Sequence, residues 1–352
     1  MPAYMRGLAS VAGVTTAAKL SSNENPLGSS PRARRAAADA LDSMHLYPEA
    51  GSAALRAAIG AFFDLDPERV FCGAGSDQVL SLLTLAYSGS GDEVVFSANG
   101  YGRFQLYARA AGATPVPISD RDFHVAVDAM LSRVGTRTKI VFLANPDNPT
   151  SLYLPAAEVR RLHAALPPHV LLVVDGAYAD YVTAEPYDGG RALVDAADNV
   201  VMARTFSKVF GLAAMRLGWV YGPAHVIETL ARVEPSFPLT APALAAGVAA
   251  LGDRDHVRRS VAHNTEWRRR FGDRLAQLGL AVYPSETNFI LVRFPPDAPE
   301  LSAEAANAYL LARGLLPRRF VAPVFADCLR ISIGTAAELT AMGDALAEFL
   351  RR

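Results

Sequence analysis

A single lysine stands where this chain could carry out amine chemistry. Only three of its 34 lysine and arginine residues are lysine, namely Lys19, Lys139 and Lys208. A guanidinium stays protonated above roughly pH 12, so only these three amines can act as nucleophiles or bases. Lys208 follows a predicted strand over residues 199–204, at the sheet edge where α/β folds bind ligands. Its apolar neighbours would lower its pKa, so Lys208 could form a Schiff base, although such a lysine by itself is more often an ordinary surface residue.

An acidic residue ends another predicted strand. Asp175 follows the apolar run Val170–Val174, and Tyr178 lies three residues later. A carboxylate at this edge could keep a ring nitrogen protonated, which a ring needs in order to accept electrons from a substrate. A helix cap is an equally common role for such an aspartate.

A glycine-containing segment, residues 73–78, separates a predicted strand from a helix beginning near Val79. Its glycines allow close approach to the backbone, and the N–H groups of a helix start favour a phosphate. Gln78 occupies the place of the third glycine in a dinucleotide motif, and the chain contains no P-loop, so a dinucleotide ligand is not expected. Ser207 and Arg216 could bind the same phosphate.

A proline-rich turn, residues 145–150, follows the predicted strand over residues 139–144. Its prolines fix the backbone and would project Asn148 over the sheet edge. By itself this segment indicates only a turn.

The elements that must position these side chains follow an α/β rhythm. Short apolar runs alternate with helix-like segments, and runs that are apolar at every position are typical of parallel strands covered on both faces. The runs are Val70–Cys72, Glu93–Phe96, Lys139–Ala144, Val170–Asp175, Asn199–Arg204 and Leu217–Tyr221. They predict a mostly parallel central sheet flanked by helices.

A second, smaller α+β domain is predicted after Pro242. Long amphipathic helices alternate there with two strand-like pieces. The helices are His256–Leu278, Ser302–Arg313 and Ala336–Phe349, and the strands are Asn288–Phe294 and Leu329–Ile333. A further helix is expected over Pro31–Ser43. We therefore expect a large domain over residues 44–245 and a small domain formed by residues 1–43 and 246–352.

Composition limits the possible functions. A chain of 352 residues fits two packed units, and its formal net charge of −1 provides no general basic field for nucleic acid. No apolar run approaches the ~20 residues that span a membrane, and the first residues lack the apolar core of a secretory signal. Cys72 and Cys328 are expected to be buried thiols in a reducing compartment. These features predict a cytoplasmic protein without nucleic-acid or membrane partners.

The motifs, taken in order, resemble those of one family over nearly the whole chain. They are Leu20–Gly28, Tyr47–Pro48, Gly75–Asp77, Tyr101–Gly102, Asn148–Thr150, Asp175 with Ala177–Tyr178, Thr205–Lys208, Arg216–Gly218, Ser285 with Asn288–Phe289, and Leu329–Gly334. The chain resembles the fold type I pyridoxal-phosphate enzymes, and among them the histidinol-phosphate aminotransferases of the class I/II aminotransferases. The resemblance implies the fold of these transferases and pyridoxal 5'-phosphate as the cofactor, with no metal.

The resemblance also implies roles around the cofactor ring. Lys208 would form the Schiff base (internal aldimine) and move the proton between the substrate Cα and cofactor C4′. Asp175 would pair with the ring nitrogen, Asn148 and Tyr178 would donate to the ring oxygen, and Tyr101 would stack on the ring.

The cofactor phosphate would be held by residues near the sheet edge. The resemblance assigns this role to Ser76, Asp77, Thr205, Ser207 and Arg216. It also implies that Tyr47 reaches the phosphate of the neighbouring subunit, so a homodimer is expected.

The resemblance implies a substrate site with two arginines. Arg330 would bind a substrate carboxylate, and Arg318, Arg330 and Tyr4 would bind the phosphate of a phosphorylated donor. The residues implied in substrate binding are Arg330, Arg318, Tyr4, Asn23 and Asn288. Because Arg319 adjoins Arg318, the sequence leaves open which of the two contacts the substrate.

The expected reaction is ping-pong transfer of an amino group from histidinol phosphate to 2-oxoglutarate, giving imidazole acetol phosphate and glutamate. Departures from the family pattern occur at Ser151, Gly176, Ser236–Pro238 and Ala322–Asp327. They leave the amino donor open. The alternatives are an aromatic or phenylalanine aminotransferase of the same subfamily, a lyase resembling threonine-phosphate decarboxylase, and a non-catalytic dimeric regulator.

Overall fold

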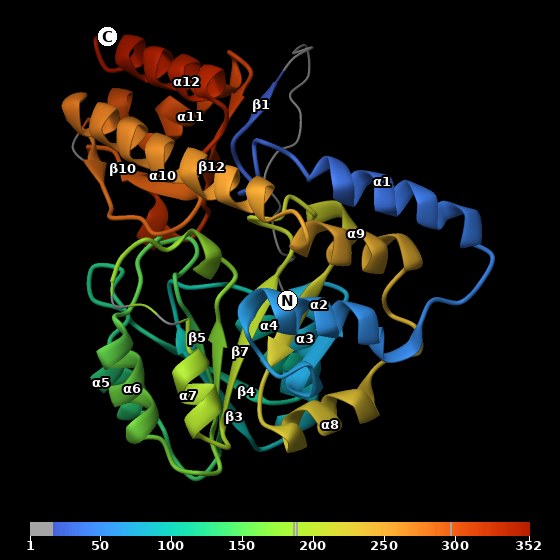
Figure 1. Ribbon diagram of the computed structural model, residues 1–352. Coiled ribbons are helices and arrows are strands. Elements are labelled where there is room, and N and C mark those ends of the chain that lie inside the picture. Colours follow the sequence, from blue (N-terminus) through green and yellow to red (C-terminus); the bar gives the residue numbers. More distant parts are fainter. Residues whose placement is uncertain (1–16, 186, 188, 296–297) are drawn as a thin grey trace.

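The apolar runs of the chain form the central sheet of a computed structural model, which describes residues 17–185, 187, 189–295 and 298–352 (Figure 1). In this part of the chain the large sheet has seven strands. Their spatial order is β2 (Val70–Gly73), β8 (Gly218–Tyr221), β7 (Val200–Thr205), β6 (Leu171–Asp175), β5 (Thr138–Ala144), β3 (Glu93–Ser97) and β4 (Thr114–Ile118). The edge strand β4 was not among the expected runs, because Pro115 and Pro117 interrupt its apolar pattern and suit only a sheet edge.

The mostly parallel sheet predicted from the sequence is confirmed. Strands β7, β6, β5, β3 and β4 run parallel, whereas β8 runs antiparallel to both of its neighbours, β7 and β2. The carboxyl ends of the parallel strands and the start of β8 therefore meet at one edge, where open sheets bind ligands.

Both faces of this sheet are buried. Val173 and Val174 are neighbours on β6, yet they belong to apolar clusters on opposite sides, as the alternation of side chains along a strand requires. One face packs against α3 (Ser76–Tyr87), α4 (Phe104–Ala110) and α8 (Ala224–Val233). The other face packs against α2 (Ala53–Phe63), α5 (Val127–Leu131), α6 (Ala156–Ala164), α7 (Arg191–Ala196) and α9 (Ala241–Leu251).

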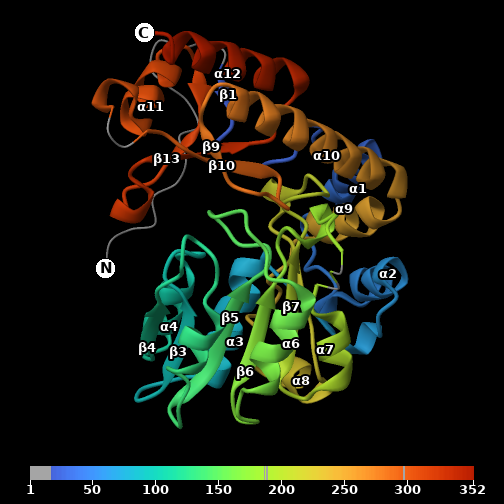
Figure 2. The ribbon, with the colours of Figure 1, turned by 90° about the vertical axis from the view of Figure 1, so that its left-hand side faces the viewer.

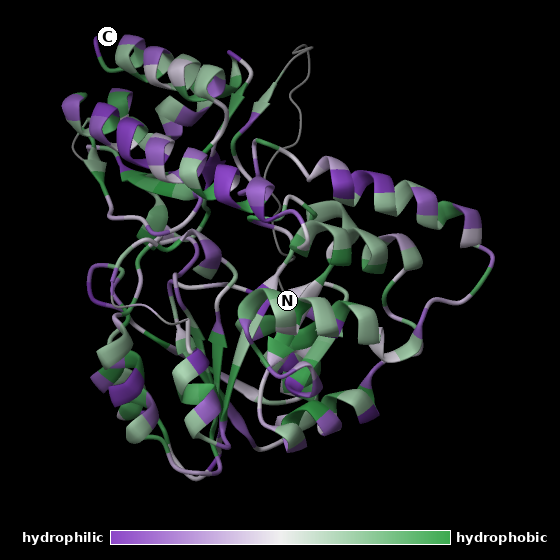
Figure 3. Ribbon diagram, viewed as in Figure 1, coloured by the Kyte–Doolittle hydropathy of each residue, from purple (hydrophilic) through white to green (hydrophobic). Residues whose placement is uncertain are grey.

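The smaller unit has its own sheet and core, and lies across the site edge of the large sheet (Figures 1 and 2). Its antiparallel sheet has the order β12 (Arg318–Arg319), β13 (Cys328–Ser332), β10 (Phe289–Arg293) and β9 (Ala281–Val282). The helices are α10 (Arg254–Gln277), α11 (Ala303–Leu311) and α12 (Ala336–Phe349), and β1 (Ala18–Lys19) pairs with β11 (Leu315–Leu316). Figure 3 shows α10 as largely hydrophilic and the strands of the large sheet as largely hydrophobic. No helix in the described part of the chain has the length and apolar character needed to span a membrane.

The N-terminal segment contacts both units. Strand β1 joins the smaller unit, but helix α1 (Pro31–Asp39) packs beside α9 (Figure 1). Ala33 and Ala37 of α1 share the apolar cluster of the large sheet with Ala243 and Ala246 of α9. Helix α9 itself crosses the expected boundary at residue 245. The division into residues 44–245 and 1–43 with 246–352 stays a prediction.

Candidate active site

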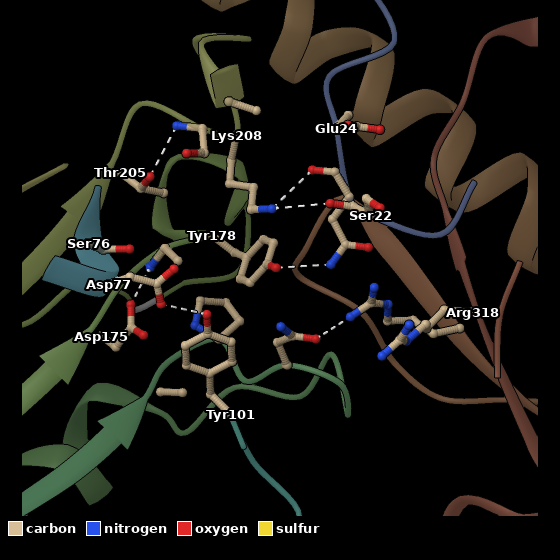
Figure 4. Close-up of a pocket in the computed structure, with 18 of the residues that line it drawn as sticks. Ser22, Glu24, Ser76, Asp77, Tyr101, Asp175, Tyr178, Thr205, Lys208 and Arg318 are labelled. Atoms are coloured by element: carbon tan, nitrogen blue, oxygen red, sulfur yellow. Dashed lines mark hydrogen bonds between the residues drawn. The ribbon is translucent and has the colours of Figure 1, made fainter. Parts of the chain in front are cut away.

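A cavity of about 630 Å³ lies at the edge of the large sheet, where the smaller unit covers it (Figure 4). Most of the side chains singled out in the sequence line this cavity. They are Asn23, Ser76, Asp77, Tyr101, Asn148, Asp175, Tyr178, Thr205, Ser207, Lys208, Arg216, Arg318 and Arg330. One site is thus formed by the ends of strands β5, β6 and β7, the start of α3, and strands β12 and β13 of the smaller unit.

Lys208 points its amine into the cavity from the loop after β7 (Figure 4). Its Nζ donates to the backbone oxygens of Ser22 (3.4 Å) and Asn23 (3.3 Å). Burial, together with the positive charges of Arg330 and Arg216, lowers the pKa of Lys208 from 10.5 to about 8. The amine therefore loses its proton close to neutral pH, as a nucleophilic lysine requires.

Asp175 is the last residue of β6 and is only 5% exposed. Its Oδ1 accepts a hydrogen bond from the N–H of Ala177 (3.1 Å), and among the described residues no lysine or arginine lies within ion-pair distance of it. Burial raises the pKa of Asp175 from 3.8 to about 7. A cation placed in the cavity would stabilise the ionised carboxylate.

The start of α3 forms a cradle for an anion. Gly75 has a φ of +84°, and a Cβ there would lie 2.4 Å from Nη2 of Arg216, so glycine makes room for the guanidinium. A Cβ on Gly218 would lie 2.1 Å from the backbone nitrogen of Ser76. Arg216 Nη1 donates to the hydroxyl of Ser207 (3.2 Å). Backbone N–H groups, a hydroxyl and a guanidinium thus meet, which is the donor set that binds phosphate.

Asp77 has a second role that the sequence did not indicate. Its carboxylate accepts hydrogen bonds from the hydroxyl of Tyr101 (2.8 Å) and from that of Tyr107, and lies 3.7 Å from Arg216. Burial and the Asp77 charge raise the pKa of Tyr107 far above its usual range, so this phenol stays a hydrogen-bond donor. Tyr107 lies inside α4 with no motif around it, and only its position on the face of α4 toward α3 could have indicated this contact.

The smaller unit contributes a buried arginine to the cavity. Arg330 on β13 donates from Nη1 to Oδ1 of Asn148 and from Nη2 to the backbone oxygen of Ser21 (2.7 Å). It is 7% exposed. The contact with Asn148 occupies the amide oxygen and leaves the Nδ2 group as the donor for a ligand.

The structure separates the two adjoining arginines of β12. Arg318 lines the cavity, whereas Arg319 pairs with Glu304 at 3.3 Å. Successive side chains of a strand point to opposite faces, so only one of the two can face the site. Arg318 is the register partner of Arg330 on the neighbouring strand.

Asn23 links the cavity to the smaller unit. Its Nδ2 donates to the hydroxyl of Tyr178 (2.9 Å), and its backbone N–H donates to Oγ of Ser332 on β13 (2.8 Å). Asn288 does not line the cavity. Its Nδ2 instead donates to the backbone oxygen of Asn23 (2.9 Å), which also accepts from Lys208.

Tyr47, like Asn288, does not line the cavity of this chain. Tyr47 is 82% exposed and stacks on Phe237, with 4.6 Å between the ring centroids. Tyr4 lies outside the described residues.

Two departures from the family pattern have structural explanations. A Cβ on Gly176 would lie 3.1 Å from Nη1 of Arg204, and a Cβ on Gly189 would lie 2.1 Å from its Nη2, so the buried Arg204 occupies this space. Ser151 has a φ of +68°, a conformation that favours glycine, and its hydroxyl donates to the backbone oxygen of Pro284 (2.8 Å).

The chain is similar to known proteins over most of its length. Residues 15–346 match the family model described as aminotransferase class I and II. The histidinol-phosphate aminotransferases of Rhodospirillum centenum and Paramagnetospirillum magneticum are 51% and 48% identical to this chain, with 99% of this chain covered in both cases and 96% and 95% of the relatives. The crystal structure of the Sinorhizobium meliloti histidinol-phosphate aminotransferase in complex with pyridoxal-5'-phosphate superposes with a TM-score of 0.87 at 31% identity, covering 94% of this chain and 90% of that one.

Proposed function

Because this chain belongs to the class I and II aminotransferases, we propose that it transfers the amino group of histidinol phosphate to 2-oxoglutarate, with pyridoxal 5'-phosphate as its cofactor. The products are imidazole acetol phosphate and glutamate. The observation that carries the proposal is one cavity holding a lysine amine of lowered pKa, a buried carboxylate and two arginines. Identities of about half over nearly the full length of two named relatives support the choice of donor.

The residues of the cavity fit this cofactor. Lys208 supplies an amine for an aldehyde, Asp175 supplies a buried carboxylate that favours a cation, and the start of α3 supplies a phosphate cradle. When bound, pyridoxal phosphate supplies an aldehyde and an electron-accepting ring. Ser76 and Asp77 would hold the phosphate through backbone N–H groups, together with Thr205, Ser207 and Arg216. The hydroxyl of Thr205 accepts from the N–H of Ser207 (3.1 Å) and so fixes this turn.

The same chain would orient the ring and move the proton. Lys208, as a neutral amine, would take the proton from the substrate Cα and return it at C4′. Asp175 would keep the proton on the ring nitrogen, while Asn148 and Tyr178 would donate to the ring oxygen. Tyr101, held by Asp77, would stack against the ring.

Arg318 and Arg330 would bind the anionic ends of both substrates. Ping-pong transfer requires one site to accept the phosphate of histidinol phosphate and then a carboxylate of 2-oxoglutarate. Guanidinium groups match both, because their forked N–H donors suit either anion. The two arginines lie side by side in the register of β12 and β13.

The active unit in this proposal is a homodimer in the cytoplasm. Large apolar side chains are exposed around Tyr47, among them Leu41, Met44 and Leu46. Such a patch is typical of an interface, and a second copy would bring its Tyr47 to the phosphate. The two cysteines are buried and free, which fits a reducing compartment. Sedimentation of the holoenzyme tests the dimer, and a monomer at micromolar concentration would contradict it.

Donor assays test the reaction. The holoenzyme, mixed with histidinol phosphate alone, should lose the absorbance of the lysine-bound pyridoxal form of the cofactor and form pyridoxamine phosphate, and 2-oxoglutarate should restore the starting spectrum. Phenylalanine should react with a kcat/KM at least tenfold lower. A higher kcat/KM for phenylalanine would favour the aromatic enzyme, and carbon dioxide release from threonine phosphate would favour the lyase.

A further inference from the structure

One aromatic ring contacts both arginines of the substrate site. The Cζ atoms of Arg318 and Arg330 each lie 5.6 Å from the ring centroid of Phe320. This is within the distance at which a cation is attracted to the face of an aromatic ring. Arg330 also lies over Phe289, with 5.0 Å between its Cζ and that ring centroid.

The position of Phe320 follows from the strands. Phe320 is two residues beyond Arg318, and side chains two apart along an extended chain point to the same side. Arg330 is the register partner of Arg318, and Phe320 directly follows the paired residues Arg318 and Arg319, so it continues toward the diagonal position beside Arg330. The strand pairing thus brings the three side chains together.

The ring of Phe320 also packs against apolar side chains. Its centroid lies 5.2 Å from that of Phe325, which stacks on Phe123 at 4.8 Å with 17° between the planes. Phe123 comes from the larger unit, where it is 3% exposed and has a φ of +65°. The cluster around Phe325 therefore contains residues of both units.

We propose that Phe320 is a positioning residue for substrate specificity, which holds Arg318 and Arg330 together so that one site accepts either a phosphate or a carboxylate. The inference rests on the proposed function. Two adjacent guanidinium groups repel each other, and an aromatic face stabilises both. Unlike a carboxylate, the ring does not neutralise their charge, so both cations keep their attraction for the substrate anion.

The test compares Phe320→Leu, Phe320→Tyr and Val321→Ala in the holoenzyme. Val321 is the next residue and is 70% exposed, so Val321→Ala serves as the matched control. Phe320→Leu should raise the KM for histidinol phosphate and for 2-oxoglutarate about fivefold each, as expected for loss of two cation–aromatic contacts, with kcat within about twofold. Phe320→Tyr should restore both KM values to within about twofold of the wild type.

Two results would overturn the inference. One is a Phe320→Leu enzyme whose KM values match those of Val321→Ala. The other is a Phe320→Tyr enzyme as impaired as Phe320→Leu, which would mean that the ring matters for packing rather than for its attraction to cations. Thermal unfolding of each variant identifies a folding defect.

Calorimetric binding of inorganic phosphate and of succinate to the holoenzymes gives a readout that does not depend on turnover. Phe320→Leu should weaken both about fivefold, and equal binding by wild type and variant would overturn the inference. If the wild-type enzyme bound both anions but did not react with histidinol phosphate, the proposed function would fail while the role of Phe320 would still be decided by the binding data.

Discussion

Arg318 and Arg330 are register partners on neighbouring antiparallel strands of the smaller unit, and both line the cavity that also holds Lys208. Lys208 and Asp175 come from strand ends of the larger unit. A substrate with its amine at Lys208 and its anionic end at the arginines would therefore contact both units. The distance from amine to anion then depends on how the two units pack.

The two arginines of β12 should differ sharply in their effect on catalysis. Arg318→Ala should raise the KM for histidinol phosphate about 10- to 100-fold, because a hydrogen bond to a charged group contributes about 1.5–3 kcal/mol. Arg319→Ala should change it less than twofold, because Arg319 pairs with Glu304 instead. Steady-state kinetics of the two variants checks this, and a larger effect at Arg319 would contradict the assignment.

Removing the amine of Lys208 should abolish transamination almost completely. Lys208→Ala should lower kcat by at least about 100-fold, since general acid–base catalysis typically contributes 10²- to 10⁴-fold. Lys139→Ala is the control, because Lys139 lies near Asp92 at the far end of β5 (4.0 Å). Borohydride reduction of the wild-type holoenzyme should attach the cofactor to the peptide containing Lys208. An adduct on Lys139 would refute the assignment.

The reactivity of the apoprotein toward aldehydes should depend on pH. The pKa of Lys208 is lowered to about 8, chiefly by burial and then by Arg330, so the neutral amine accumulates as the pH rises through 8. The initial rate of pyridoxal phosphate attachment at Lys208, trapped with borohydride, should rise from pH 6 to pH 8 and level off above pH 9. Arg330→Met removes a positive charge that lowers the pKa of Lys208. In this variant the midpoint of the rise in attachment rate should therefore move to higher pH. An unchanged or lower midpoint would speak against this coupling.

Asp147 should make the apoprotein less stable as the pH rises. Burial raises its pKa from 3.8 to about 7, while its Oδ2 accepts a hydrogen bond from Thr150 (2.8 Å). A raised carboxyl pKa stabilises the fold below pH 4, and this contribution is lost as the pH rises from about 4 through 7. The amide side chain of the Asp147→Asn variant does not titrate. The free energy of unfolding of this variant minus that of the wild type should therefore increase between pH 4 and pH 8, by on the order of 1–3 kcal/mol.

Urea unfolding at several pH values measures this difference. Asp198→Asn is the matched control, because Asp198 is exposed and its replacement should give no such increase. If the difference in the free energy of unfolding between Asp147→Asn and the wild type stayed constant with pH, the Asp147 carboxyl would not be the source of the pH dependence.

Much of the candidate site could be predicted from local sequence. Apolar runs place Asp175 and Lys208 at or just beyond strand ends, and the carboxyl ends of parallel strands share one edge. Residues distant from any motif could not be found in this way. Tyr107 reaches Asp77 only because α4 packs against α3. Strand β4 could not be predicted from apolar residues, because its prolines interrupt their pattern.

The sequence by itself determined the chemistry of this protein, because the side chains that can act as amine, acid and anion binder are a matter of residue type and of position relative to local elements. Only the tertiary structure decided which neighbours cooperate. Arg318 rather than Arg319 faces the cavity, and Phe320 contacts two arginines, because the register of β12 on β13 sets the face of every side chain. That register depends on pairing with a strand ten residues further along the chain, which the residue pattern of β12 alone does not encode.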